Sequence, residues 1–531
     1  MPEPRWDREV DYLVLGGGSA GCVLTDRLSQ DGRHQVLLVE AGPPDRNPFI
    51  HIPAGFLRLI DDPVVSWRYR SQPCATAGGR AIAYPQGRML GGTGSLNGML
   101  YVRSTRIEHG EWAAQGCEGW SFDEVLPFYR RIENVDGQAP DHPLPVSAFV
   151  EQHPLSEAFL HACGQAGLAV RDGLNGSERE GAAAFHQTRA GRFRRGPAQT
   201  YLRRARRRAN VSVLTGTLVL RVLFEGPRAV GAELQSPSGR LRVRARREVV
   251  VACGAVRSPH LLQLSGIGPG ALLAQLGVPV VADRPGVGAN LRDHYSVRLT
   301  QRVDGIGTLN ERTRGLALAG ELLRYAVGGR GLLTLGASTA AAFVRSDAGQ
   351  PAPDLQLSFA PASFQPGTYR LEDRPGMTIN VFHSYPRSTG TVLARSADPA
   401  EAPAISPGYL QAPEDRQALV AGLRIARRLF TMPALQRWAR QETLPGPQVE
   451  SDEDLLAYAA ASGVSGYHLV GTCRMGGDDD SVVDPQLRVR GVQGLRIADA
   501  SVLPSGTSGN SHAPTLMAAE KASALLLADA R

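Results

Sequence analysis

The first forty residues alternate between short apolar runs and glycine-rich or polar breaks. Residues 11–15 form a short apolar run after Asp11, and residues 16–21 are rich in glycine. Residues 22–29 carry apolar positions at helical spacing, and 36–39 form a second apolar run that ends at Glu40. Two buried runs joined by a glycine turn and a helical segment are typical of parallel strands with a crossover helix. This pattern predicts a βαβ unit and therefore an α/β fold with a parallel sheet.

Later segments follow a different pattern. Residues 43–98 are rich in proline and glycine and predict irregular structure, followed by helices at 122–133 and 155–166. Period-two alternation predicts strands at 211–214, 218–224, 229–235 and 241–251, with a hairpin turn at Pro237-Ser238-Gly239 and a helix at 255–264. Residues 300–460 mix predicted helices (316–327, 414–430, 452–461) with strands (354–359, 377–384, 391–393). We interpret this half as a second, substrate-facing domain of mixed sheet and helices.

The glycine turn carries a recognisable spacing. Gly16, Gly18 and Gly21 form a G-x-G-x-x-G motif between a predicted strand and a helix, and Glu40 follows at the end of the next strand. Glycines at these positions let the backbone approach a pyrophosphate at the helix N-terminus, and the acid can bind an adenosine ribose. The motif predicts dinucleotide binding but does not choose between NAD and FAD.

Five further blocks carry a family resemblance. The segment 87–99, GRMLGGTGSLNGM, is similar to the flavin-contacting signature of the glucose–methanol–choline (GMC) oxidoreductases, and the segments 254–269, 285–294, 468–476 and 496–514 are similar to later blocks of that family. The resemblance implies a Rossmann-like FAD-binding domain at 8–298 and a mainly substrate-binding domain at 299–460. It also implies a C-terminal region at 385–526, of which 461–526 returns to the FAD domain.

The same resemblance assigns residues to the cofactor. They are Gly16, Gly18, Ser19, Ala20, Gly21, Glu40, Ala41, Gly92, Asn97, Gly98, Met99, Val219, Asp499, Ala500 and Asn510. It places Gly16, Gly18 and Gly21 at the pyrophosphate. Some relatives attach the flavin covalently through a histidine just before the asparagine. Leu96 stands at that position here, so non-covalent FAD is expected.

Histidine is the expected proton acceptor, because an alcohol barely ionises at neutral pH and imidazole titrates near pH 6.5. By resemblance, His468 is the general base and His512 is its partner at the substrate oxygen. His294 also matches the family, and we interpret it as structural.

Composition narrows the chemistry further. Of 58 lysines and arginines only Lys521 is a lysine, outside any lysine-dependent motif, which argues against Schiff-base, pyridoxal-phosphate, P-loop and kinase chemistry. The net charge of +7 comes from dispersed arginines; the densest run, 203–208, lacks interleaved aromatics and predicts a solvated helix face rather than a nucleic-acid surface.

The sequence contains no clear motif for metal binding, secretion or membrane insertion. The six cysteines lie far apart without a Cys-x-x-Cys pair, so we expect free thiols and no metal site. The chain opens without a signal-peptide pattern, and the uncharged apolar stretch at 331–344 is too short for a membrane span. We therefore expect a cytoplasmic protein with no integral membrane segment.

The expected reaction is FAD-dependent oxidation of a primary alcohol to an aldehyde, with electrons passed to a non-oxygen acceptor such as a quinone. Thr339 falls where choline-oxidising relatives carry a glutamate, and Ala340, Ala341 and Ala342 make its surroundings small and apolar, so choline is disfavoured. The alternatives are an alcohol oxidase that uses O2, a hydroxynitrile lyase-type enzyme that keeps FAD, a nicotinamide dehydrogenase and, least favoured, a non-enzymatic nucleic-acid binder.

Overall fold

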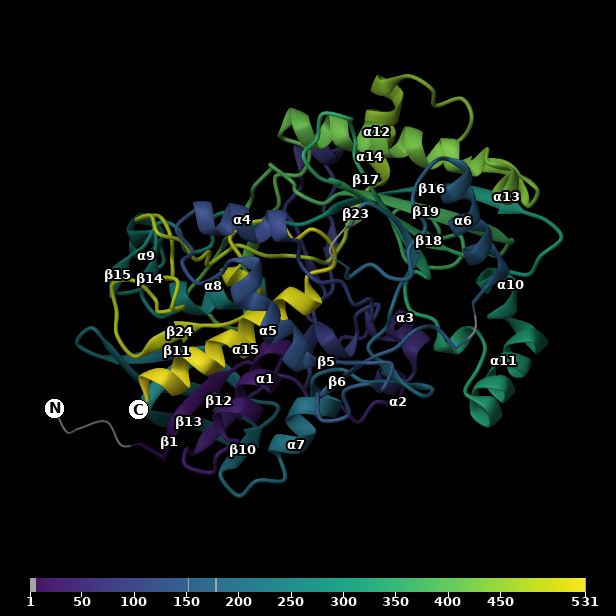
Figure 1. Ribbon diagram of the computed structural model, residues 1–531. Helices are drawn as coiled ribbons and strands as arrows, with labels where there is room; N and C mark the ends of the chain where they lie inside the picture. Colours follow the sequence, from purple (N-terminus) through teal and green to yellow (C-terminus); the bar gives the residue numbers. More distant parts are fainter. Residues whose placement is uncertain (1–5, 151, 177–178, 531) are drawn as a thin grey trace.

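The computed structural model describes residues 6–150, 152–176 and 179–530. In this part of the chain the strands form two seven-stranded sheets, each with its own layer of helices, together with several two-stranded ribbons (Figure 1). The predicted α/β class, with a Rossmann-like part and a second region of mixed sheet and helices, is confirmed.

The first sheet contains the predicted βαβ unit. Parallel strands β10 (Val211–Leu214), β2 (Val36–Val39), β1 (Arg8–Leu15) and β13 (Gly239–Val251) lie in that order, and β12 (Arg228–Ser236) and β11 (Leu218–Glu225) extend the sheet antiparallel. Strand β24 (Leu495–Ile497) pairs with β13, so the C-terminal segment returns to this sheet. Leu15, Val251 and Ile497 pair in register, and the carboxyl ends of three parallel strands therefore meet at one edge.

Helices α1 (Ser19–Leu28) and α15 (His512–Asp529) pack against each other over this sheet (Figure 1). The hydroxyl of Tyr12 in β1 lies 3.5 Å from the carbonyl of Leu526 in α15. Since α1 begins immediately after the glycine turn, α15 is held beside the same edge where the parallel strands end.

The second sheet is antiparallel. Its order is β22 (Ala439–Leu444), β16 (Tyr295–Val303), β19 (Gly376–His383), β18 (Leu355–Ala360), β17 (Ala340–Val344) and β7 (Gly181–Ala184), and β23 (Val464–Ser465) pairs with β16. Helix α12 (Pro413–Phe430) packs on one face, where a Cβ at Gly422 would lie 2.5 Å from Val381. The other face is open to a cavity. Because β7 comes from within residues 8–298, the sheets do not divide the chain at a single point, and the domain boundaries stay a prediction.

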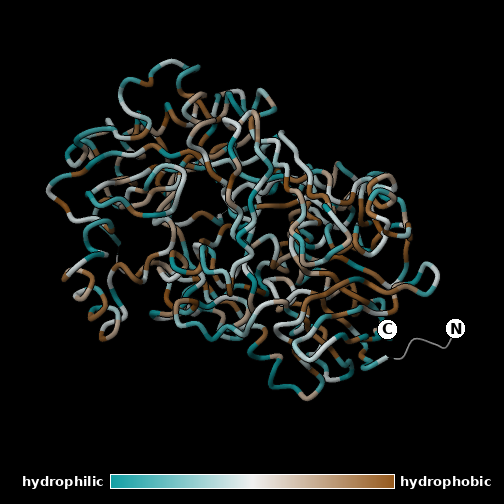
Figure 2. Tube along the Cα trace, turned by 180° about the vertical axis from the view of Figure 1, so that it is seen from behind, coloured by the Kyte–Doolittle hydropathy of each residue, from teal (hydrophilic) through white to brown (hydrophobic). Residues whose placement is uncertain are grey.

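Most predicted helices begin and end within a few residues of the expected positions: α5 (Phe122–Ile132), α6 (Pro154–Gln165), α8 (Gly254–Leu264), α11 (Gly315–Gly328) and α14 (Asp452–Ser462). Residues 43–98 contain only short elements, such as α2 (Pro48–His51), α3 (Phe56–Leu59), β3 (Tyr69–Arg70) and β4 (Ala83–Tyr84). Helices α4 (Arg106–Ala114) and α9 (Gly270–Gln275) and strands β16 and β17 were not expected from the pattern. Helix α11 carries exposed apolar side chains and projects at the lower left in Figure 2.

The arginine run at 203–208 is only partly the solvated face that the sequence predicts. Arg204 and Arg208 form ion pairs with the two carboxylate oxygens of Asp26, at 2.6 and 2.9 Å. Asp26 is fully buried in α1. These two arginines therefore attach α7 (Arg203–Ala205) and the residues after it to the first sheet's helical layer.

Other composition-based expectations can be compared directly with the structure. All six cysteines are free, and five of them are buried. Among the described residues, no group of three or more His, Cys, Asp or Glu side chains is arranged to hold a metal ion. Within the same described ranges, no helix combines the length and apolarity needed to cross a bilayer.

Candidate active site

A large cavity lies between the carboxyl ends of the first sheet's parallel strands and the open face of the second sheet. This edge is where open α/β sheets bind their ligands. The backbone turns approach closely there: a Cβ on Gly16 would lie 2.4 Å from the carbonyl of Ala252, and one on Gly92 would lie 2.7 Å from Gly18. Any larger side chain at Gly16 or Gly92 would collide with backbone.

Glu40 lies at the end of β2 and lines one end of the cavity. Its two carboxylate oxygens accept hydrogen bonds from the amides of Gly17 (2.9 Å) and Gly42 (2.8 Å). Burial raises the pKa of Glu40 to about 7. The carboxylate is thus fixed beside the glycine turn, as ribose recognition requires.

Nearly all of the residues expected to contact the cofactor line this one cavity: Gly16, Gly18, Ser19, Ala20, Glu40, Ala41, Gly92, Asn97, Gly98, Met99, Val219, Asp499, Ala500 and Asn510. Gly21 does not. A Cβ there would lie 1.9 Å from the carbonyl of Gly16. Gly21 therefore permits close packing of α1 against the turn, and its expected place at the pyrophosphate stays a prediction.

The residues present fit an extended dinucleotide. Asp499 anchors the C-terminal strand end by accepting from the amide of Gly254 (2.8 Å) and the hydroxyl of Ser258 (2.5 Å). Arg194, fully buried, donates to the side-chain and backbone oxygens of Asn97, both at 2.7 Å. Both contacts stiffen loops that line the cavity, which favours a preorganised cofactor site.

His468 follows β23 in a turn that Asp293 holds in place. One oxygen of Asp293 accepts from the His468 amide at 2.8 Å, and the other accepts from the hydroxyls of Ser465 (2.5 Å) and Tyr409. Tyr467 has a φ of 62°, the left-handed region that ordinary side chains rarely adopt. The turn therefore depends on Asp293, which directs the imidazole of His468 into the cavity.

The ring of His468 is held in one tautomer. Nε2 of His294 donates to the carbonyl of Ser384 at 2.9 Å, so Nδ1 of the neutral His294 ring carries a lone pair. That Nδ1 lies 2.8 Å from Nδ1 of His468, which must then be the donor. The remaining nitrogen, Nε2 of His468, carries the lone pair and accepts a hydrogen bond from the amide nitrogen of Asn510 at 2.9 Å. His294, expected to be structural, is therefore a positioning residue.

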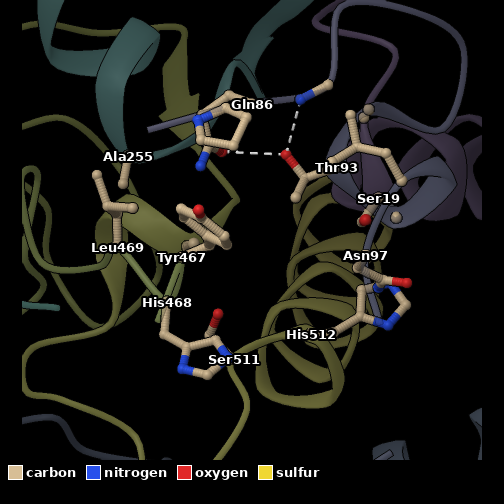
Figure 3. Close-up of a pocket in the computed structure, with 18 of the residues that line it drawn as sticks. Ser19, Gln86, Thr93, Asn97, Ala255, Tyr467, His468, Leu469, Ser511 and His512 are labelled. Carbon is tan, nitrogen blue, oxygen red and sulfur yellow. Dashed lines mark hydrogen bonds between the residues drawn. The ribbon is translucent and has the colours of Figure 1, made fainter. Parts of the chain in front are cut away.

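His512 is the first residue of α15, and it lines the same cavity as His468 (Figure 3). Three buried polar atoms here have no hydrogen-bond partner among the described residues: the two ring nitrogens of His512 and Oδ1 of Asn510. Buried polar groups without partners are rare, and here they lie around a cavity. They are available to bind a hydroxyl.

Burial keeps these imidazoles neutral. Desolvation lowers the pKa of His294 to about 4 and that of His512 to about 4, with Arg194 contributing at His512. Desolvation and the neighbouring His294 hold the pKa of His468 well below 6.5. At physiological pH all three rings are therefore neutral.

The open face of the second sheet supplies the other end of the cavity, and sequence reasoning missed it. Alternate positions of three neighbouring strands line the cavity: Ser296, Arg298, Gln356, Ser358, Ala360, Thr378, Asn380 and Phe382. The intervening residues, among them Leu357, Ile379 and Val381, are fully buried in the core beneath α12. Polar residues alternating with core residues in interior strands were the available signal.

Thr339 does not face this cavity. Its hydroxyl lies 2.8 Å from that of Ser156 in α6, and its neighbours Ala340, Ala341 and Ala342 are fully buried in β17. Ala337 and Ser338 line the cavity instead. The expectation that Thr339 and the three alanines surround the substrate is therefore wrong, because Thr339 packs against α6.

Comparisons with known proteins agree with this geometry. Residues 10–296 and 386–519 match the N- and C-terminal family profiles, each described as GMC oxidoreductase. A protein named oxygen-dependent choline dehydrogenase from Photobacterium profundum is 38% identical over 527 residues, covering 97% of this chain and 93% of that protein. Pyridoxine 4-oxidase from Mesorbium loti has a TM-score of 0.87 at 30% identity, covering 97% of this chain and 98% of that one. Formate oxidase shares the fold, with a TM-score of 0.91 at 24% identity and 99% coverage of both chains.

Proposed function

The chain belongs to the GMC oxidoreductase family, FAD-dependent enzymes that act on CH–OH donors, and we propose that it oxidises a primary alcohol to an aldehyde with His468 as general base. The observation that carries this proposal is the unprotonated Nε2 of His468 at the cavity wall, which the bond from His468 to His294 determines and which accepts from the Asn510 amide. Bound FAD supplies the hydride acceptor for such an oxidation.

The residues of the glycine turn and of the C-terminal segment hold the cofactor in this proposal. Glu40 accepts hydrogen bonds from the ribose, Gly16 and Gly18 leave room for the pyrophosphate, and the backbone of Val219 contacts the adenine. Gly92, Asn97 and Gly98 approach the isoalloxazine ring. Their common position on one cavity supports this assignment. With Leu96 in place of a histidine, the FAD is held without a covalent bond.

The proton step belongs to the chain's own residues. Nε2 of His468 takes the hydroxyl proton, because that nitrogen is unprotonated at neutral pH. His512 binds the substrate oxygen through a ring N–H that has no partner among the described residues. His294 holds the ring of His468 so that the lone pair stays directed at the hydroxyl.

Two kinds of alcohol-oxidising enzyme differ in the electron acceptor that reoxidises the flavin. We propose a non-oxygen acceptor such as a quinone. Oxygen is the second candidate, because one relative is named an oxygen-dependent dehydrogenase and one structural neighbour an oxidase. The rate at which the reduced enzyme is reoxidised by air, compared with a soluble quinone, distinguishes the two.

The test is anaerobic mixing of the yellow holoenzyme with a panel of primary alcohols while the flavin absorbance is followed. We expect bleaching in the parent protein and a loss on the order of 10³-fold in the bleaching rate for His468→Ala. His161→Ala is the matched control, because His161 is exposed in α6. Unchanged bleaching in His468→Ala would contradict its role as base, and no bleaching with any alcohol would favour a lyase. Acid precipitation should release the FAD into the supernatant.

A further inference from the structure

We infer that the substrate alcohol carries a carboxylate group and that Arg298 binds it at the far end of the cavity from the cofactor. This inference rests on the proposed alcohol oxidation and adds the substrate class to it. It is carried by a buried, cavity-lining guanidinium that has no acidic partner among the described residues.

Arg298 lies in a row with the catalytic machinery. His294 immediately precedes β16, and Ser296 and Arg298 follow at alternate positions, which lie on one face of the strand. Four residues at about 3.4 Å each separate the Cα atoms of His294 and Arg298 by roughly 13 Å. Since His294 contacts His468, the row runs from the base to the guanidinium. A substrate lying along it presents its hydroxyl at one end and its other functional group at the other.

The guanidinium is held rigidly but is not neutralised. Its Cζ atom lies 4.8 Å from the ring centre of Phe364 and 4.5 Å from that of Tyr369, and Nη1 donates to the carbonyl of Thr368. Nη2 has no hydrogen-bond partner among the described residues, and the whole residue is 7% exposed. A planar guanidinium held in one position, with an unused N–H donor on Nη2, suits a carboxylate, because the two groups can form paired hydrogen bonds.

The carboxylates that line the described part of the cavity are bound by other groups. Glu40 and Asp499 are the acidic side chains among the described cavity-lining residues, and their oxygens already accept hydrogen bonds in the cofactor half. Asp293 is bound by Ser465, Tyr409 and the amide of His468. The cavity therefore offers an unpaired positive charge to the substrate and no free negative one.

This charge distribution disfavours a quaternary ammonium substrate. A cationic head group beside Arg298 would face a like charge in a desolvated space, whereas a carboxylate would complete the arginine's hydrogen bonds. The lining around Arg298, with Ser296, Ser358 and Asn380, adds polar groups that can donate to the same carboxylate. Choline is therefore disfavoured because of Arg298, not because of Thr339.

The first test uses the unmodified holoenzyme. Anaerobic flavin bleaching is measured with three alcohols: 6-hydroxyhexanoate, 1-hexanol and choline. We expect the carboxylate alcohol to show at least a 10-fold higher kcat/KM than 1-hexanol and choline to show the lowest. Equal values for 6-hydroxyhexanoate and 1-hexanol, repeated with 4-(hydroxymethyl)benzoate and 4-methylbenzyl alcohol, would overturn the inference while leaving alcohol oxidation intact. Bleaching by none of these alcohols would instead contradict the proposed function.

The second test changes the arginine. Arg298→Met should raise the KM for 6-hydroxyhexanoate by 10- to 100-fold and leave that for 1-hexanol within about twofold, and Arg298→Lys should restore part of the preference. Arg302→Met is the matched control. Arg302 lies on the same face of β16, four residues later, but is paired with Glu372 at 2.7 Å and does not line the cavity.

A purely structural role for Arg298 gives a different result. Loss of its contacts to Phe364, Tyr369 and Thr368 would lower the turnover of all alcohols together, along with FAD content and melting temperature. An equal loss for neutral and carboxylate alcohols in Arg298→Met would therefore overturn the inference. As a measurement that needs no variant, hexanoate should inhibit oxidation of 1-hexanol competitively, and the same concentration of tetramethylammonium should not.

Discussion

The Nδ1 atom of His294 lies 2.8 Å from the Nδ1 atom of His468, and the two rings meet edge to face with their centres 5.0 Å apart. Because the carbonyl of Ser384 can only accept a hydrogen bond, it fixes the proton of His294 on Nε2. One backbone carbonyl thus determines, through two imidazoles, which nitrogen of His468 is unprotonated. Two neighbouring residues hold His468. The carboxylate of Asp293 accepts from the backbone amide of His468, and the ring of His294 accepts from the ring of His468.

Without Nδ1 of His294 as hydrogen-bond acceptor, His468 should still act as the base, but less efficiently. In His294→Leu, the Nδ1 proton of His468 loses its partner, and we expect the flavin bleaching rate to fall on the order of 10²-fold with FAD still bound. His294→Gln should recover much of the rate, because its amide can donate to Ser384 and accept from His468. A glutamine variant as slow as the leucine variant would argue against control of the tautomer.

The pH profile reports on the same ring. His468 must be unprotonated to act as base, and its pKa is held well below 6.5 by desolvation and His294. We expect kcat/KM to stay level as the pH falls from 8 to 6.5 and to decline only in more acidic solution. A half-maximal value near pH 6.5, as for an ordinary exposed histidine, would contradict this environment. His294→Leu should change the position of the acid limb.

Glu108 couples pH to stability. It is fully buried in α4, one oxygen accepts from the amide of Ser508, and burial raises its pKa to about 7 from 4.5. A raised carboxyl pKa contributes stability that is fully present below pH 4.5 and is lost as the pH rises through about 7.

Glu108→Gln should therefore match the parent near pH 4.5 and exceed it above pH 7, by up to about 3 kcal/mol. The measurement is denaturant unfolding of the holoenzyme at pH 5 and pH 8. Glu118→Gln, an exposed position close in sequence, is the control and should show no such divergence. A constant difference at both pH values would show that Glu108 does not titrate in this range.

Asp26 joins α1 to two arginines. Since it is fully buried and pairs with Arg204 and Arg208, Asp26→Asn leaves both arginines without an anionic partner. The arginines keep partial solvent access, which moderates the cost, so we expect a loss of about 1–3 kcal/mol. Thermal unfolding compared with Asp31→Asn, whose pair with Arg33 is exposed, measures it. Equal melting temperatures in the two variants would mean that this attachment contributes nothing.

Thr339→Glu should not create a choline-oxidising enzyme. Its side chain faces Ser156 in the core, so a glutamate there would be buried without a cationic partner and should cost several kcal/mol. We expect a lower melting temperature and no gain in choline-dependent bleaching, with Thr339→Val as the shape-matched control. A rise in choline turnover would show that position 339 reaches the substrate.

Local sequence order predicted a large part of this protein. The glycine turn and Glu40 lie within one βαβ unit, and residues close in sequence on rigid elements keep their spacing when the chain folds. The resemblance to the GMC family added FAD and the fold. It also indicated distant residues that the structure brings to one cavity, such as Asn97 and His512.

Long-range packing decided the rest. Successive residues of a strand face opposite sides, so a difference of one position determines whether a side chain meets the core or the cavity. For this reason Thr339 packs against the core and Arg298 lines the cavity. In β17 the apolar run is buried on both faces, so no alternation in the sequence indicated how Thr339 would point. The bond from His468 to His294 spans 174 residues, and it exists only because β16 and β23 pair in the folded protein. The sequence determined which chemistry is available, and the tertiary structure determined which nitrogen and which charge face the substrate.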